Sequence, residues 1–405
     1  MNARNAHNST AFTLAAELTQ DPEVLTLLIS AGADIGIRDD DGDNALMCAA
    51  VGNTNPDVIK TLVTAGLDVS SCTQKEGITA LMRAAQRNSS AEIIETLVEL
   101  GADVNARTKS GTTALMYALQ AEYPEVSVIN ALLTANANVN AKDKDDITAL
   151  MYAVQNTNIN LDTIRTLISV DSDVNAKDYY DSTVLMYAAR YSKNPDVIKL
   201  LVGAGAKVNV KDKNPLTALM WAARYNSNPE IIKGLVAAKA DVNARTEDEG
   251  ESALMQAAGY NENADMVKAL IESGANVNAR NESGWISLMY AVANNASSVS
   301  CLKTLIEAGA NVNAQDEIGR SALLLAVICN RDSKVIRALL EGGASVKLKD
   351  ESDMSALLWA VLDSTDPDVI KALIEAGSDV TSKYKDSRTA LMFYLLKNKN
   401  PRLSQ

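Results

Sequence analysis

The sequence predicts an all-α solenoid, an elongated stack of about twelve helix–loop–helix repeats. The main observation is the heptapeptide at 217–223, Thr-Ala-Leu-Met-Trp-Ala-Ala, which recurs along the chain at intervals of 34 or 35 residues. Its Ala-Leu-Met core begins at Ala45, Ala80, Ala114, Ala149, Ala218, Ala253 and Ala390, and looser copies begin at Ala11, Val184, Ser287, Ala322 and Ala356. Such a period is typical of stacked units that bury apolar faces against their neighbours. We therefore expect a single array over residues 1–405.

The composition argues against several classes of partner. Aromatic residues make up 4% of the chain, so the core must consist of Ala, Leu, Val, Ile and Met. The net charge of −13 repels phosphate backbones and anionic lipids, so neither nucleic acid nor a membrane surface is expected. No apolar run reaches the ~18–20 residues of a membrane span, and no signal peptide is visible. The four cysteines lack paired spacing, which predicts free thiols and favours a reducing, cytoplasmic compartment.

Residues 182–212 show the local signals of one repeat. Thr183 is suited to cap a first helix over 184–191, in which Leu185, Ala188 and Ala189 share a face. Asn-Pro-Asp at 194–196 then favours the start of a second helix, because Asn caps, Pro fits the first helical position and an acid suits the helix dipole.

The second helix is predicted to stop at Gly205, since glycine tolerates the left-handed backbone after a helix end. Similar start signals stand at 21–23, 55–57, 228–230 and 366–368. Glycine fills the stop position again at Gly32, Gly66, Gly101, Gly274, Gly309, Gly343 and Gly377, whereas Asn136, Asp171 and Lys239 replace it and predict strained or altered turns. An extended arm over 206–212 then leads to a polar turn, and we call this protruding segment the finger.

These residues resemble the ankyrin repeat. Gly-Ala-Asp-Val-Asn-Ala at 101–106 matches the family's finger, and Thr-Ala-Leu-Met-x-Ala-Ala stands where the family has Thr-Pro-Leu-His-x-Ala-Ala. The resemblance covers essentially the whole chain and implies helix pairs whose fingers and first helices line a concave groove where partners dock. The variant looks similar to bacterial ankyrin proteins.

Two departures from the family pattern are visible. The period exceeds the usual 33 residues, with the extra residue in surface loops. Methionine replaces the histidine, which predicts apolar packing in place of a polar network between repeats. Nine methionines occupy this position: Met47, Met82, Met116, Met151, Met186, Met220, Met255, Met289 and Met392.

The two ends differ from the interior. Residues 1–5 align with the finger at 277–281, and residues 398–401 align with the loop at 192–195. The last unit thus has a first helix and almost no second helix. This pattern predicts an excised array or a truncated reading frame.

No catalytic, cofactor or metal site is expected. His7 is the only histidine, so no nucleophile–histidine pair can be assembled. No glycine-rich phosphate loop follows a strand, and no Cys/His cluster could hold zinc. The acidic fingertips at 39–41 and 247–249 lack calcium-loop spacing and are interpreted as solvated turns.

Aromatic residues point instead to a binding surface. Residues 179–290 hold nine of the seventeen aromatics, namely Tyr179, Tyr180, Tyr187, Tyr191, Trp221, Tyr225, Tyr260, Trp285 and Tyr290. In two first helices the aromatics stand at i and i+4 with arginine at i+3: Tyr187, Arg190 and Tyr191, then Trp221, Arg224 and Tyr225. This spacing places all three on one helical face, and Tyr, Trp and Arg dominate interface hot spots. Arg83 and Arg87 are candidates to extend the basic edge.

Packing is the alternative explanation for part of this pattern. The residue after Met, or after Leu358 in one repeat, is aromatic in seven repeats distributed along the array, as expected for a half-buried structural position: Tyr117, Tyr152, Tyr187, Trp221, Tyr290, Trp359 and Phe393. Tyr191, Tyr225 and Tyr260 lie one turn later, where packing explains an aromatic residue less well.

The sequence therefore predicts a non-enzymatic, monomeric scaffold that binds a protein or peptide in its groove, centred on repeats five to eight. The arginines would pair with acidic or polar groups of the partner, with tyrosines stacking around them. The alternative is a spacer array of a larger effector or surface protein whose activity lies outside this chain. A spacer would need no local enrichment in Tyr and Arg.

Overall fold

In the described part of the protein, the regular secondary structure is helical, with isolated bridges at the fingers and irregular segments between the helices. The computed structural model describes residues 2–294, 299–330, 332–362, 366–381 and 392. Within these ranges β-structure is limited to isolated bridges at the fingers, such as that between Lys177 and Thr183. The predicted all-α repeat fold is confirmed. The last copy of the heptapeptide, at Ala390, and the end of the chain lie outside the described residues.

Two helices alternate along the chain. The first helices are α1 (Ala11–Leu18), α3 (Ala45–Gly52), α5 (Ala80–Arg87), α7 (Ala114–Gln120), α9 (Ala149–Gln155), α11 (Val184–Tyr191), α13 (Ala218–Tyr225), α15 (Ala253–Tyr260), α17 (Ser287–Ala293), α19 (Ala322–Leu325, continued as a π-helix over Ala326–Asn330) and α21 (Ala356–Leu362). The second helices are α2 (Pro22–Ser30), α4 (Pro56–Thr64), α6 (Ala91–Glu99), α8 (Val126–Thr134), α10 (Leu161–Ser169), α12 (Asp196–Gly203), α14 (Pro229–Ala237), α16 (Ala264–Glu272), α18 (Val299–Glu307), α20 (Ser333–Glu341) and α22 (Pro367–Glu375).

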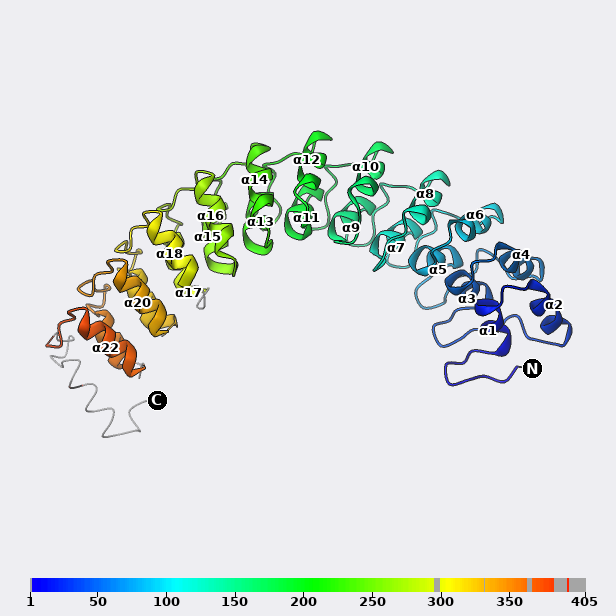
Figure 1. Ribbon diagram of the computed structural model, residues 1–405, viewed down its shortest axis with the longest axis horizontal. Coiled ribbons are helices and arrows are strands. Elements are labelled where there is room, and N and C mark those ends of the chain that lie inside the picture. The colour runs from blue at the N-terminus through cyan, green and yellow to red at the C-terminus, as the bar shows by residue number, and fades with distance from the viewer. Residues whose placement is uncertain (1, 295–298, 331, 363–365, 382–391, 393–405) are drawn as a thin grey trace. The chain divides into compact units, whose positions relative to one another are not determined.

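The structure consists of two compact units, residues 1–192 with 203–206, and residues 193–202 with 207–405. Within each unit, first helices pack against neighbouring first helices, and second helices against second helices. Figure 1 shows these two rows, for example α5, α7 and α9 beside α4, α6 and α8 in the first unit. A single continuous array over 1–405 stays a prediction.

The start and stop signals operate as the sequence predicts. The Thr183 hydroxyl accepts a hydrogen bond from the Met186 N–H at 3.4 Å, and the Asn228 side chain accepts one from the Glu230 N–H at 3.0 Å. Gly205 has φ of +94°. The non-glycine stop residues are also left-handed, with φ of 61° at Asn136, 63° at Asp171 and 69° at Lys239.

The methionines of the interior repeats pack in the apolar core as predicted, and three of them also make a polar contact within their own repeat. The methionine side chains of the interior repeats are buried, as at Met186, which is 1% exposed. In three repeats the sulfur also accepts the N–H of the helix-capping residue, at 3.5 Å from Thr79, 3.3 Å from Thr183 and 3.4 Å from Ser252. The thioether thus satisfies a backbone donor that would otherwise be buried without a partner.

A buried asparagine after the first helix ties successive repeats together. The side-chain amide of Asn88 donates to the carbonyls of Ala50 and Asn53, at 2.9 and 2.8 Å, in the preceding repeat. We call such a pair of bonds a rung. Equivalent rungs join Asn53 to Ala16 and Thr19, Asn156 to Leu119 and Ala121, and Asn261 to Ala223 and Asn226.

The fingers are joined in the same way. The amide of Asn243 donates to the Gly274 carbonyl at 3.1 Å, and its oxygen accepts the Asn276 N–H at 2.8 Å. Asn105, Asn140, Asn209, Asn278 and Asn313 repeat this two-way exchange with the next finger. The fingers are thereby held in register independently of the core.

Replacing Asn261 with Ala should destabilise the protein by about 2–4 kcal/mol, because two buried carbonyls lose their donor. The measurement is the urea unfolding midpoint, with the exposed neighbour Glu262→Ala as the control, for which a change below about 0.5 kcal/mol is expected. Equal effects of the two substitutions would contradict a stabilising rung.

Replacing Lys239 with Gly should stabilise the protein by about 0.5–1 kcal/mol, since the left-handed backbone strains a lysine and suits glycine. The matched reverse change, Gly274→Ala, should destabilise it because Gly274 has φ of +94°. Thermal melting of both variants tests the pair, and a lower melting temperature for Lys239→Gly would refute the strain.

Candidate partner-binding site

The aromatic residue after Met has a structural role within its own repeat. The Tyr187 hydroxyl donates to Asp178 at 2.8 Å, and the Trp221 indole N–H donates to Asp212 at 2.9 Å. The other oxygen of each carboxylate accepts two N–H groups of the finger turn. Tyr152 with Asp143 and Trp359 with Asp350 make the same pair. The first helix and finger of a repeat are therefore fixed to each other.

Burial, followed by the hydrogen bond to Asp178, raises the pKa of Tyr187 well above its ordinary value of 10. The phenol thus remains protonated and donates to the carboxylate throughout the neutral range. Tyr187 and Trp221 are half-buried, and their polar tips face the finger of their own repeat.

In the first unit, Tyr191 extends this arrangement toward solvent. Its ring stacks on Tyr187 with centroids 6.3 Å apart and is 37% exposed. The Arg190 guanidinium lies 4.9 Å from the Tyr191 ring centroid. On the finger of the same repeat, Tyr179 and Tyr180 are 59% and 57% exposed and meet edge to face at 5.2 Å. The structure thus places all five predicted residues of this repeat on its first helix and fingertip.

In the second unit, Arg224 connects two tyrosines from successive repeats. Its guanidinium lies 3.9 Å from the Tyr260 centroid and 5.4 Å from the Tyr225 centroid, within cation–π range. The rings of Trp221 and Tyr225 are 5.4 Å apart. Tyr225 and Tyr260 are 45% and 42% exposed, so this cluster presents aromatic surface to solvent.

The sequence did not reveal a polar network behind this cluster. Gln256 takes the position after Met, is 1% exposed, accepts from Arg224 Nη1 at 3.2 Å and donates to Glu251 at 2.5 Å. The other Glu251 oxygen accepts from the Tyr290 hydroxyl at 2.5 Å, and that hydroxyl accepts from Asn281 at 2.9 Å. The network supports the orientation of Arg224 from three consecutive repeats. The one feature of the sequence that could have indicated this network is Gln256, which stands where several other repeats have an aromatic residue.

Trp285 lies in a contact between repeats of the second unit. Its indole N–H donates to Asp316 at 3.1 Å, and Arg320 donates to the same carboxylate oxygen at 2.8 Å. The ring is half-buried, 5.4 Å from Tyr290. Trp285 is therefore less accessible to a partner than Tyr225 or Tyr260.

Arg83 does not extend the basic edge, which corrects the sequence interpretation. Its guanidinium pairs with Asp43 of the preceding repeat at 2.9 Å, and the two side chains are only 13% and 9% exposed. Burial raises the pKa of Asp43 above its ordinary value of 3.8, and Arg83 opposes that rise. The pair acts as an internal link between repeats.

The described residues show no cluster suited to binding a metal ion. No group of three potential metal ligands is present among them, and none of their helices is long and apolar enough to cross a membrane. Burial raises the pKa of the Cys301 thiol to about 12, which disfavours a reactive thiolate there.

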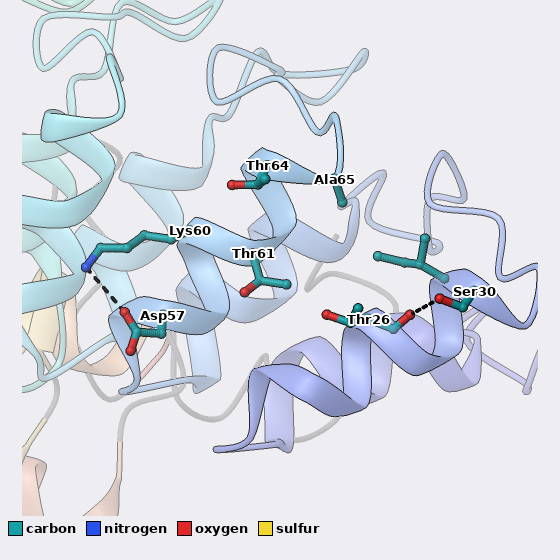
Figure 2. Close-up of a pocket in the computed structure, with 8 residues that line it drawn as sticks. Thr26, Ser30, Asp57, Lys60, Thr61, Thr64 and Ala65 are labelled. Atoms are coloured by element: carbon teal, nitrogen blue, oxygen red, sulfur yellow. Dashed lines mark hydrogen bonds and ion pairs between the residues drawn. The ribbon is translucent and has the colours of Figure 1, made fainter.

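A hollow of about 570 Å³ lies between α2 and α4 (Figure 2). Its hydroxyls are engaged locally, since Ser30 and Thr26 donate to backbone carbonyls of their own helix. Lys60 pairs with the exposed Asp57 at 3.3 Å. The hollow is a groove between neighbouring second helices, and these four side chains already have partners within their own helices.

These repeated helix pairs and linked fingers define a helical-repeat solenoid protein. The family model described as ankyrin repeats (3 copies) matches residues 12–108, 50–143, 93–178, 121–212, 185–281, 219–316 and 288–384. The chain therefore belongs to the ankyrin-repeat family, whose members are generally protein–protein interaction modules and typically non-enzymatic. No curated protein matches the chain.

Replacing Arg83 with Met should cost about 3 kcal/mol at pH 7, because the buried Asp43 carboxylate loses its partner. The substitution should raise the Asp43 pKa further. A raised pKa favours the folded state when the carboxyl is protonated, so the deficit should shrink as the pH falls through the folded pKa toward 3.8.

The measurement is the unfolding midpoint of both proteins between pH 7 and pH 4.5. A deficit that stays constant over this range would show that Asp43 does not titrate in the variant. The exposed pair offers a control: Lys60→Met should have little effect at either pH.

Proposed function

We propose that this protein is a non-enzymatic scaffold that binds a protein or peptide partner on its finger face. The finger face comprises the fingers and the side of the first helices that contacts them. From the resemblance to ankyrin repeats, we expect this surface to be concave. The observation that carries the proposal is the Arg224 cluster. The Arg224 guanidinium is hydrogen-bonded to Gln256 and lies within cation–π range of two exposed tyrosines. Rigid aromatic and arginine side chains are the residues that contribute most to protein interfaces.

Each unit presents exposed aromatic side chains on its own fingers or first helices. Tyr191, Tyr179 and Tyr180 would contribute in the first unit, and Tyr225 and Tyr260 in the second. Tyr187, Trp221 and Trp285 would act mainly by positioning the exposed rings, because their own polar atoms are engaged inside the protein. Arg190 and Arg224 would contact acidic or polar groups of the partner.

The acidic fingertips favour a partner with basic surface elsewhere. Asp248 and Glu249 are exposed on the finger that precedes α15. Charge complementarity of this kind accelerates association more than it increases affinity. With a net charge of −13, nucleic acid and anionic membranes remain unsuitable partners in this proposal.

The triple variant Tyr191→Ala, Arg224→Ala, Tyr225→Ala should lose a partner that the wild type captures from source-cell lysate. Two hot-spot side chains and a cation are removed, so we expect at least a 100-fold drop in affinity. The matched control replaces exposed residues of the second helices: Arg165→Ala, Lys233→Ala and Ile374→Ala. Thermal melting of both variants checks that they are folded.

Capture of the same protein by both variants would place the site elsewhere. Capture of nothing specific by the wild type would favour the spacer array of a larger effector or surface protein.

A further inference from the structure

The usual rung is missing between the third repeat, whose first helix is α5, and the fourth repeat, whose first helix is α7. Helices α7 and α9 both have seven residues, and α9 is followed by the rung residue Asn156. The corresponding residue after α7 is Ala121, which has no side-chain amide. The loop that follows carries an additional residue relative to the third repeat and contains Glu122 and Tyr123.

Without an asparagine at this position, two carbonyl oxygens lose the amide donor that the other rungs supply. By analogy with the other rungs, the acceptors would be the carbonyls of Ala85 and Asn88 at the end of α5. No residue in the described ranges donates a hydrogen bond to either oxygen. Both residues are buried, at 4% and 6% exposure, where an unpaired carbonyl is costly.

These two residues line a hollow of about 250 Å³ that opens between the two interhelical loops. Ala121 and Tyr123 line it from the fourth repeat, and Tyr123 is 74% exposed. Charged side chains of both signs stand around it, namely Arg87, Glu122 and Glu125. The hollow therefore combines two residues whose carbonyls lack the usual amide donor, an exposed aromatic ring and charged side chains of both signs.

We propose that this hollow binds the side-chain amide of an asparagine or glutamine presented by a protein partner. In the two neighbouring rungs, the equivalent carbonyls accept from an asparagine amide nitrogen. The distances are 2.9 and 2.8 Å for Asn88, and again 2.9 and 2.8 Å for Asn156. The carbonyl end of a helix favours hydrogen-bond donors, and a neutral donor suits a rim of mixed charge. Tyr123 provides apolar surface for the residues that flank the amide in a protein loop.

This site is separate from the tyrosine clusters and does not depend on the proposed function. The substitution Ala121→Asn should supply the missing amide from within the chain and close the site. It should also raise the unfolding midpoint, because two buried acceptors become paired. The substitution Asn156→Ala should have the opposite effect and open an equivalent pair of acceptors at Leu119 and Ala121.

The test selects displayed nonapeptides on the wild-type protein and counter-selects them on Ala121→Asn. We expect the selected peptides to share an asparagine or glutamine and to bind Ala121→Asn at least tenfold more weakly. Changing that residue to aspartate or lysine in a selected peptide should abolish binding. The triple variant of the tyrosine clusters should bind the peptides normally, which separates this site from the proposed one.

Titration calorimetry of Asn156→Ala with a selected peptide supplies a second readout that does not require Ala121→Asn to fold well. An increase in stoichiometry from one site to two is the expected result. The proposal is overturned if lysine or arginine is selected instead, if both proteins bind alike, or if no amide-dependent peptide emerges. That last result would mean that the hollow holds water only.

Discussion

The structure depends on side-chain amides that complete the hydrogen bonding of the preceding repeat. A helix end leaves carbonyls without intrahelical donors, and in a stack this end is covered by the next repeat and partly withheld from water. An asparagine such as Asn88 or Asn261 supplies both missing bonds from a single nitrogen. Each repeat is therefore satisfied only when its neighbour is folded, which makes stability a nearest-neighbour property.

Scaffold and binding surface share residues in this protein. The polar tip of Tyr187 or Trp221 fixes the finger, while its ring supports Tyr191 or Tyr225 one turn later. A binding surface built this way loses little conformational entropy when a partner docks, because its inner rings are already held by buried carboxylates. The residue after Met is thus both the packing position and the foundation of the candidate site.

The sequence was informative wherever the physical cause is local. Caps, proline starts and the left-handed stop at Gly205 each involve residues within a few positions, and all were predicted correctly. Contacts across about one period were not predicted, including Arg83 with Asp43 and Trp285 with Asp316. An asparagine after a helix is compatible with capping, with solvent exposure or with a rung, and only the neighbouring backbone decides among them.

Replacements of the residue that is usual at a repeat position are of two kinds, which the neighbouring side chains and backbone distinguish. Gln256 replaces an aromatic residue, and Arg224, Glu251 and Tyr290 have adjusted so that its amide is bonded on both sides. Ala121 replaces an asparagine, and nothing in the described chain takes over the bonds it cannot make. A compensated replacement leaves the stack complete, whereas an uncompensated one leaves carbonyls beside a hollow without their usual donor. The stability lost at an uncompensated position is recovered when a ligand donates hydrogen bonds to these carbonyls. Such a position therefore favours ligand binding.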